Sequence, residues 1–182
     1  MIRAILHRIL NIILGILTGF LVVWLTYIIW LTNFSDWAVE QRVREIYSQI
    51  IVASGQSNKW LPLIIDESNV DNAYATQDRI VIYKGLINKS SWDGIAFVLG
   101  HEYAHNLLWH TRIEDKYYRG EFAQTAESMA DQVGAFLMMK AGYDICKARD
   151  EWRELQENQG DYIGGTHMTY GYRKDLLNIN CE

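Results

Sequence analysis

Two histidines and a glutamate stand in the pattern H-E-x-x-H, formed by His101, Glu102 and His105. On a helix, residues four positions apart lie one turn apart on the same face, so two imidazoles can bind one metal ion, usually Zn²⁺. Glu102 lies beside that face, where its carboxylate can take a proton from a metal-activated water and deliver it to a leaving amine. The pattern therefore indicates zinc-dependent hydrolysis of peptide bonds, with Glu102 as the general base.

The residues around the motif favour a metal site over a surface helix with two unrelated histidines. Most positions between 95 and 109 are apolar, so the predicted helix should be buried. Buried histidine and glutamate side chains need partners, because burying a polar group without one is costly. We expect the motif to hold one Zn²⁺ per chain.

A third metal ligand must come from elsewhere in the chain, because a catalytic zinc site normally has three protein ligands and one open position. The candidates after the motif are His110, Glu114, Asp115, Glu121, Glu127, Asp131 and His167. Glu127 is favoured because it lies in an otherwise apolar predicted helix, where a lone carboxylate would be costly. Asp131, one turn further, is expected to accept a hydrogen bond from a ligand histidine. His110 does not share the face of the histidine pair and is expected to be a hydrogen-bonded structural residue.

Predicted helices position these side chains. Ser91 is expected to cap the helix that carries the motif, and the helix that carries Glu127 should end at Gly142. Asp144 should cap a further helix. Three short apolar segments are predicted strands: residues 61–66, 72–76 and 79–83. Residues 77–78 form a polar turn between the last two. The sequence thus predicts a mainly α-helical domain with a small antiparallel β-sheet.

An uncharged, apolar run covers positions 9–31. About 20 such residues span a bilayer, and Trp24, Tyr27 and Trp30 cluster near its far end, as interfacial aromatic residues do. A signal peptide would have a shorter apolar core followed by a cleavage site, and residues 31–36 offer no such site. The sequence predicts an uncleaved transmembrane helix within an anchor of residues 1–33 and a catalytic domain of residues 34–182.

The charges that flank this run give a weak signal for its orientation. Arg3 and Arg8 precede it, and Arg42 and Arg44 follow it, so the count of lysine and arginine is equal. The amino terminus and the closeness of Arg8 to the run favour a cytoplasmic N-terminus, which places the catalytic domain in the periplasm or an equivalent compartment. A helix capped by Ser35 is expected to follow the run and to end at Gly55.

The composition and net charge bear on nucleic-acid binding and on the role of the two cysteines. The chain has 182 residues and a formal net charge of −5, so it lacks the basic footprint of a nucleic-acid-binding protein. Cys146 and Cys181 match no metal-binding spacing. They could form a disulfide in an oxidising compartment or remain two free thiols, and the sequence does not decide between these states.

Several segments, in order, resemble the HtpX and CAAX-prenyl-endopeptidase type of zinc metallopeptidases, a gluzincin family with a zincin-like α+β domain. The similarity is greatest to the short Oma-, BepA- and LoiP-like members. The matching segments are residues 72–75, 81–86, 98–105 with His110, 127–131, 141–144, and 166–167 with Arg173. Together they follow the order of the family from about residue 43 to residue 177, which is most of the part after the predicted anchor.

The resemblance implies a role for each matching residue. It implies that His101, His105 and Glu127 bind zinc, that Glu102 is the general base and that Asp131 orients a ligand. It also implies that His167 and Arg173 line the active site, where they would stabilise an oxyanion. Substrate would pair as an extended strand along Asn72, Ala73 and Tyr74.

Two functions from different classes fit these residues. The first is a membrane-anchored zinc endopeptidase that cuts unfolded or misassembled proteins. The second is a zinc-containing, chaperone-like binding module that keeps the peptidase fold but has little turnover. Glu102 favours the enzyme, because a binding module needs no base beside its metal.

Overall fold

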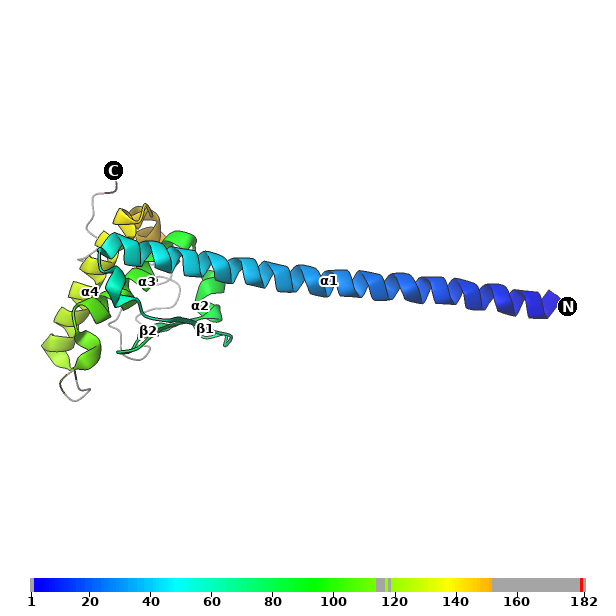
Figure 1. Cartoon of the computed structure of the whole chain (residues 1–182), viewed down its shortest axis with the longest axis horizontal. Helices are drawn as coiled ribbons and strands as arrows, with labels where there is room; N and C mark the ends of the chain where they lie inside the picture. The colour runs from blue at the N-terminus through cyan, green and yellow to red at the C-terminus, as the bar shows by residue number, and fades with distance from the viewer. Residues whose placement is uncertain (1, 114–116, 118, 152–180, 182) are drawn as a thin grey trace. The chain divides into compact units, whose positions relative to one another are not determined.

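The computed structural model describes residues 2–113, 117, 119–151 and 181, and it divides into two compact units, residues 1–42 and 43–182 (Figure 1). Helix α1 (Ile2–Ser54) supplies the first unit and continues into the second. Within the described residues, α1 is the one helix that is long and apolar enough to cross a bilayer. Large apolar side chains such as Phe20 and Trp24 are exposed along it, which supports the predicted membrane anchor.

Helix α1 passes through Ser35 without interruption, so the predicted cap at this residue is wrong. The Ser35 hydroxyl donates to the carbonyl oxygen of Thr32, at 2.7 Å, within the helix. Serine side chains bond to the preceding turn as readily as they cap, and neither proline nor glycine stands near Ser35 to stop the helix. The predicted end is confirmed, because α1 stops at Ser54 and Gly55 adopts a φ of +71°.

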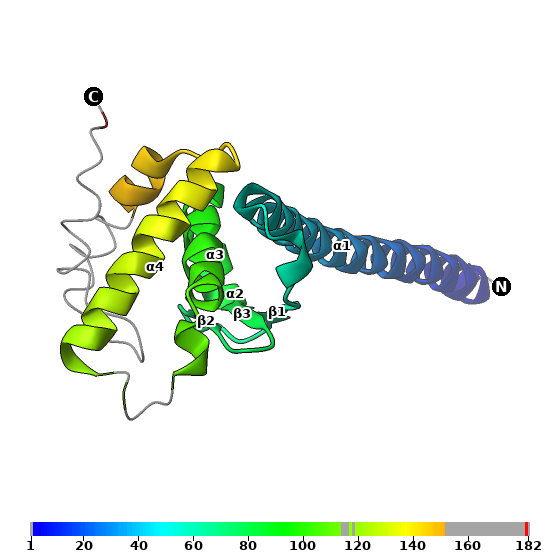
Figure 2. The ribbon, with the colours of Figure 1, turned by 60° about the vertical axis from the view of Figure 1, so that its left-hand side comes forward.

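The second unit combines helices with a small sheet, which confirms the predicted mainly helical class. Its further elements are η1 (Ser57–Lys59), β1 (Leu63–Asp66), β2 (Ala73–Ala75), β3 (Ile80–Tyr83), α2 (Lys84–Lys89), α3 (Trp92–Leu107), η2 (His110–Arg112) and α4 (Gly120–Lys140). Helix α3 contacts α4 and also the strands β2 and β3 (Figure 2). It therefore lies at the centre of this unit, with most of its length buried.

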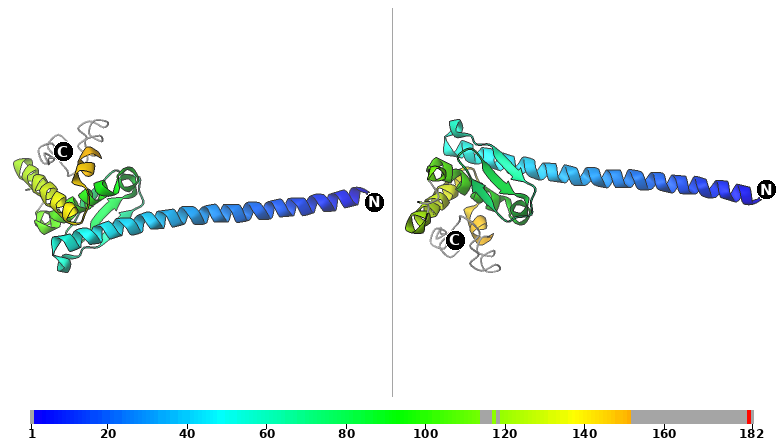
Figure 3. Two further views of the ribbon diagram at one scale, coloured as in Figure 1. Left: turned by 90° about the horizontal axis from the view of Figure 1, so that it is seen from above. Right: turned by 90° about the horizontal axis from the view of Figure 1, so that it is seen from below.

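The sheet is mixed, whereas the sequence predicted an antiparallel one. Its strand order is β1-β3-β2, with Leu63 paired to Ile80 in the parallel ladder and Ala73 paired to Ile82 in the antiparallel ladder (Figure 3). The loop after β1 takes the chain to the opposite edge of the sheet, where β2 forms. The β2–β3 hairpin then returns through the centre, so β3 runs parallel to β1. Residues 77–78 form the predicted turn, closed by a hydrogen bond from the Thr76 amide to the Arg79 carbonyl at 2.9 Å.

The short helix α2 was not predicted from the sequence. Its N-cap position is occupied by Tyr83, whose side chain makes no capping hydrogen bond. Backbone carbonyls of the loop after β1 accept hydrogen bonds from the first turn of α2 instead. The amides of Gly85 and Leu86 donate to the carbonyls of Ser68 and Val70. A Cβ at Gly85 would lie 2.5 Å from the Val70 oxygen, so this contact requires glycine.

Two glycines set the distance between α3 and α4. A Cβ on Gly134 would lie 2.6 Å from the backbone nitrogen of His101, and one on Gly100 would lie 2.8 Å from the carbonyl oxygen of Gly134. Real side chains do not tolerate such contacts, so the backbones can pass this closely only because both residues are glycine. The close crossing allows side chains of α4 to reach the motif on α3.

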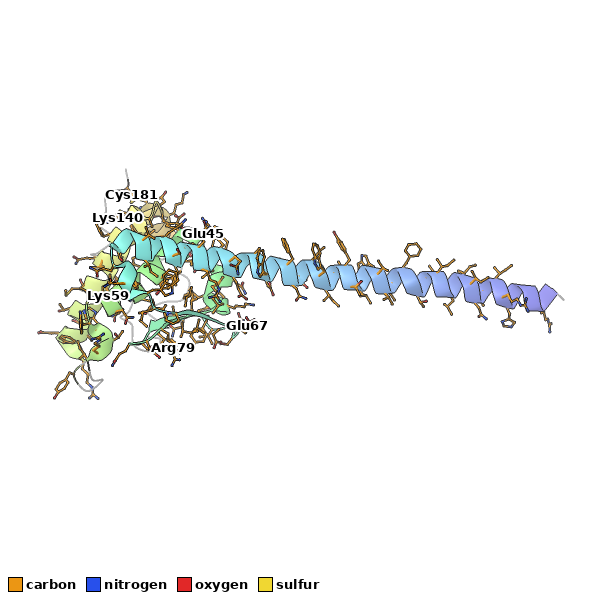
Figure 4. The ribbon with its side chains drawn as sticks, in the orientation of Figure 1. Glu45, Lys59, Glu67, Arg79, Lys140 and Cys181 are labelled. Carbon is orange, nitrogen blue, oxygen red and sulfur yellow. A yellow bond between two sulfur atoms is a disulfide. The ribbon has the colours of Figure 1, made fainter. Side chains whose placement is uncertain are left out.

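A disulfide joins Cys146 to Cys181, the residue labelled in Figure 4, which resolves the alternative that the sequence left open. Cys146 lies in the helical segment of residues 145–151. As predicted, Asp144 caps that segment, with its carboxylate accepting from the Cys146 amide at 2.9 Å. The same segment contacts the start of α3, where Glu151 accepts a hydrogen bond from the Ser91 amide.

Candidate metal centre

Helix α3 carries His101, Glu102 and His105 in its second half. The predicted cap is confirmed: the Ser91 hydroxyl accepts from the Gly94 amide at 3.0 Å. Apolar side chains such as Ile95 and Leu99 are fully buried around the first turns of the helix. The motif is thus held on a rigid, buried helix rather than on a loop.

Buried polar side chains gather at one place. Six histidine or acidic side chains are buried among the residues that the structure describes: His101, Glu102, His105, His110, Glu127 and Asp131. Their exposed fractions lie between 1% and 8%, which is unusual for ionisable groups unless each has a partner. They come from α3, η2 and α4, elements separated in the sequence. This gathering indicates a built site and not scattered polar residues.

His101, His105 and Glu127 form a group that could hold one metal ion. Their ligand atoms all lie within 4.8 Å of one another. His101 Nε2 is 3.0 Å from His105 Nε2, and the two oxygens of Glu127 lie 3.3 Å from His101 Nε2 and 3.4 Å from His105 Nε2.

These distances and the donor types suit zinc. Ligand atoms about 2.0–2.2 Å from a tetrahedral zinc stand roughly 3.3–3.6 Å apart. The two separations between histidine and Glu127 fall in that range, and the separation between the histidines is a few tenths of an ångström shorter. Two imidazoles and one carboxylate are also the donor set of many catalytic zinc sites, which leave one position open. The residues present therefore fit a zinc ion.

Asp131 lies behind His101, on the side away from Glu127. Its Oδ1 is 2.7 Å from His101 Nδ1, while His101 Nε2 faces the metal group. A carboxylate at this distance favours a proton on Nδ1 and leaves Nε2 free to bind metal. The structure thus places Asp131 where the sequence predicted a residue that orients a ligand.

His110 contacts the other ligand histidine. Its Nδ1 lies 3.1 Å from Nδ1 of His105, so it is hydrogen-bonded and buried, as predicted. Burial is the main cause that lowers the pKa of His110, to about 4, and the neighbouring His105 lowers it further. Burial also lowers the pKa of His105, against the opposing effect of Glu127. Both imidazoles are therefore neutral near pH 7, the state in which histidine binds metal.

The other predicted site residues lie elsewhere or cannot be placed. Asn72 precedes β2, and Ala73 and Tyr74 lie in β2, an outer strand of the sheet that contacts α3. Glu121 is exposed at the start of α4 and is not one of the buried polar residues. Glu114, Asp115, His167 and Arg173 lie outside the described residues, so the roles predicted for His167 and Arg173 stay predictions.

Comparisons with known proteins agree with this geometry. Residues 38–122 match the model of peptidase family M48, a segment that includes the H-E-x-x-H motif and ends before Glu127. The chain is also similar to the mitochondrial metalloendopeptidase OMA1 of Arabidopsis thaliana, with 24% identity over 173 residues. That alignment covers 78% of this chain and 36% of the relative, so the chain spans about a third of the length of this curated relative.

Proposed function

This chain belongs to peptidase family M48, a family of zinc-dependent metallopeptidases, and on this premise we propose that it is a membrane-anchored endopeptidase that acts on protein substrates. The observation that carries the proposal is the buried group of His101, His105 and Glu127, with Glu102 next to the first ligand. These residues supply the metal ligands and the base that peptide hydrolysis requires.

The side chains at this site have separate roles in peptide hydrolysis. Zinc, when bound by His101, His105 and Glu127, supplies Lewis acidity that polarises a peptide carbonyl and makes water more acidic. Glu102 takes a proton from the attacking water on its carboxylate and then gives it to the amine that leaves. Asp131 holds the ring of His101 in the tautomer that keeps Nε2 available.

The position of β2 supports a mode of substrate binding. It is an outer strand in the order β1-β3-β2, and it contacts α3, the helix that carries the base. We propose that substrate pairs as an extended chain along Asn72, Ala73 and Tyr74. Backbone pairing recognises the extended shape more than particular side chains, so unfolded or misassembled proteins are the substrates it favours.

Purified full-length protein in detergent should therefore cut reduced, unfolded casein at internal peptide bonds. Mass spectrometry of the products should show new internal termini from the earliest time points, because an extended chain can enter the site at any point along its length. As a control, one tightly folded protein is offered both in its native form and after unfolding, and the native form should be cut far more slowly. Products shortened one residue at a time from either end, or equal cleavage of folded and unfolded substrate, would contradict the proposal.

The disulfide supports the proposed orientation in the membrane. Disulfides form and persist in oxidising compartments and are rare in the cytosol. The bond between Cys146 and Cys181 therefore favours a location of residues 43–182 outside the cytoplasm, in agreement with the weak signal from the amino terminus and the closeness of Arg8 to the apolar run.

A fluorescent protein that folds only in the cytoplasm, fused after Glu182, should stay dark in cells. The same reporter fused before Met1 should fluoresce, and this second fusion controls for expression and membrane insertion. Fluorescence from the C-terminal fusion would reverse the orientation while leaving the proposed chemistry in place.

A further inference from the structure

The two ring nitrogens of His105 face two different partners. Nε2 points into the metal group, at 3.0 Å from His101 Nε2 and 3.4 Å from Glu127. Nδ1 lies 3.1 Å from Nδ1 of His110, which is itself buried. His110 therefore contacts His105 on the side of the ring that faces away from the metal group.

The tautomers of the two rings follow from their chemistry. A neutral imidazole carries one proton, so a His105 that binds metal through Nε2 must hold its proton on Nδ1. That proton can be donated to His110 only if Nδ1 of His110 is the acceptor, which places the proton of His110 on its own Nε2. The contact thus defines the tautomers of both rings.

We propose that His110 is a positioning residue, which fixes the tautomer and the ring orientation of His105 so that Nε2 is presented to zinc. The inference rests on the proposed function, because it takes His105 as a zinc ligand. It gives the two ligand histidines different supports: His101 is held by the carboxylate of Asp131, and His105 by a second imidazole.

A neutral support is suited to this side of the site. Glu102, Glu127 and Asp131 already bring three buried carboxyl groups to the metal group. A further carboxylate next to His105 would add like charge in a buried region, where charge repulsion is strong. An imidazole offers an acceptor nitrogen without adding negative charge.

The turn after α3 places His110 against His105. The helix ends at Leu107, and Trp109 then adopts a φ of +66°, in the left-handed region that bulky residues rarely occupy. Strained conformations of this kind persist where surrounding contacts hold them and are common near functional sites. Here the reversal brings η2 back toward the end of α3, so that His110 reaches the His105 ring.

Contacts on both sides of the turn hold it in this conformation. The guanidinium of Arg112 lies 3.8 Å from the centre of the Trp109 ring, and the ammonium of Lys59 (labelled in Figure 4) lies 5.7 Å from it. The Thr111 hydroxyl donates to the Asn106 side chain at 3.1 Å. The turn is therefore fixed independently of the contact between the two imidazoles.

Zinc affinity of full-length variants, measured by competition with a chromophoric chelator, tests the proposal. Leucine in His110→Leu fills much of the same space but cannot accept the hydrogen bond from His105, so zinc binding should weaken about tenfold to a hundredfold. His110→Asn offers a carbonyl oxygen close to the place of Nδ1 and should restore most of the lost affinity. Thr125→Val removes an exposed hydrogen bond within α4, which holds neither the turn nor a ligand, and should leave zinc affinity unchanged.

Two further measurements separate positioning from folding. Metal-free His110→Leu and His110→Asn should melt at similar temperatures, and cobalt-substituted His110→Leu should show an altered visible spectrum that His110→Asn restores. Wild-type zinc affinity in His110→Leu, or equal weakening in the Leu and Asn variants, would overturn the proposal. If His110→Leu does not fold, the comparison of wild-type and His110→Asn proteins still tests the proposal. A large loss of zinc affinity in His110→Asn would contradict it. Failure of the wild-type protein to bind zinc would instead refute the proposed function.

Discussion

Glu102→Gln should leave zinc bound and remove most peptide hydrolysis. The amide keeps the size of the side chain but cannot take a proton from water, and a positioned general base typically contributes roughly a hundredfold to ten-thousandfold in rate. Glu102 is not one of the three residues whose ligand atoms converge, so the metal group stays intact. The test compares the rate of casein cleavage per bound zinc in the variant and the wild-type protein.

Glu121→Gln is the matched control for this experiment. Glu121 is an exposed glutamate in the first turn of α4, outside the buried group, so its amide variant should cleave at the wild-type rate. Wild-type turnover in Glu102→Gln would show that another residue acts as the base. The experiment also separates the two functions that the sequence left open, since a binding module would show no zinc-dependent cleavage in either protein.

Glu127→Ala should lose zinc and, with it, all cleavage above background. Glu127 approaches both histidines through its two oxygens and is 1% exposed. Loss of a residue that only orients a ligand lowers metal affinity by about tenfold to a hundredfold. Loss of a ligand should exceed that range. Zinc content after dialysis and turnover at saturating substrate are the two measurements.

Two controls show whether this effect is specific. Glu121→Ala, on the same helix but exposed, should keep both zinc and activity. Thermal melting of the metal-free proteins should show that Glu127→Ala remains folded, because the change removes a carboxylate whose burial without metal is costly. A Glu127→Ala protein that retains one zinc per chain and cleaves casein normally would remove Glu127 from the ligand set.

Local signals in the sequence predicted the parts of the site that lie within one element. The spacing of His101 and His105 fixes their common face on a helix, and Ser91 and Asp144 cap helices where the sequence placed them. Glu127 could be chosen over other acidic residues because its helix is apolar around it. These features depend on residues a few positions apart, and a sequence shows such relations directly.

Features that depend on distant contacts could not be predicted in the same way. The direction of β3 relative to β1 depends on the path of the loop between β1 and β2, which no short motif determines. The close crossing at Gly100 and Gly134 was missed because either glycine alone suggests only a permissive backbone. His110 was correctly predicted to be hydrogen-bonded, but its partner depends on the left-handed turn at Trp109.

The contact at Asp131 lies between these two cases. Its position one turn after Glu127 placed it on the correct face of α4, and the structure puts its carboxylate 2.7 Å from His101. The sequence could not say which histidine it would face. That choice depends on how α3 and α4 cross.

Titration of metal-free protein with zinc, while casein cleavage is recorded, measures whether peptide hydrolysis depends on one bound zinc per chain. Full-length protein stripped with a chelator should be inactive, and activity should rise linearly with added zinc and stop rising at one zinc per chain. This result would show that one zinc, bound at one site, is needed for peptide hydrolysis. Full activity in the stripped protein, or no activity after one equivalent of zinc has bound, would show that this chain is not a peptidase that depends on one zinc ion.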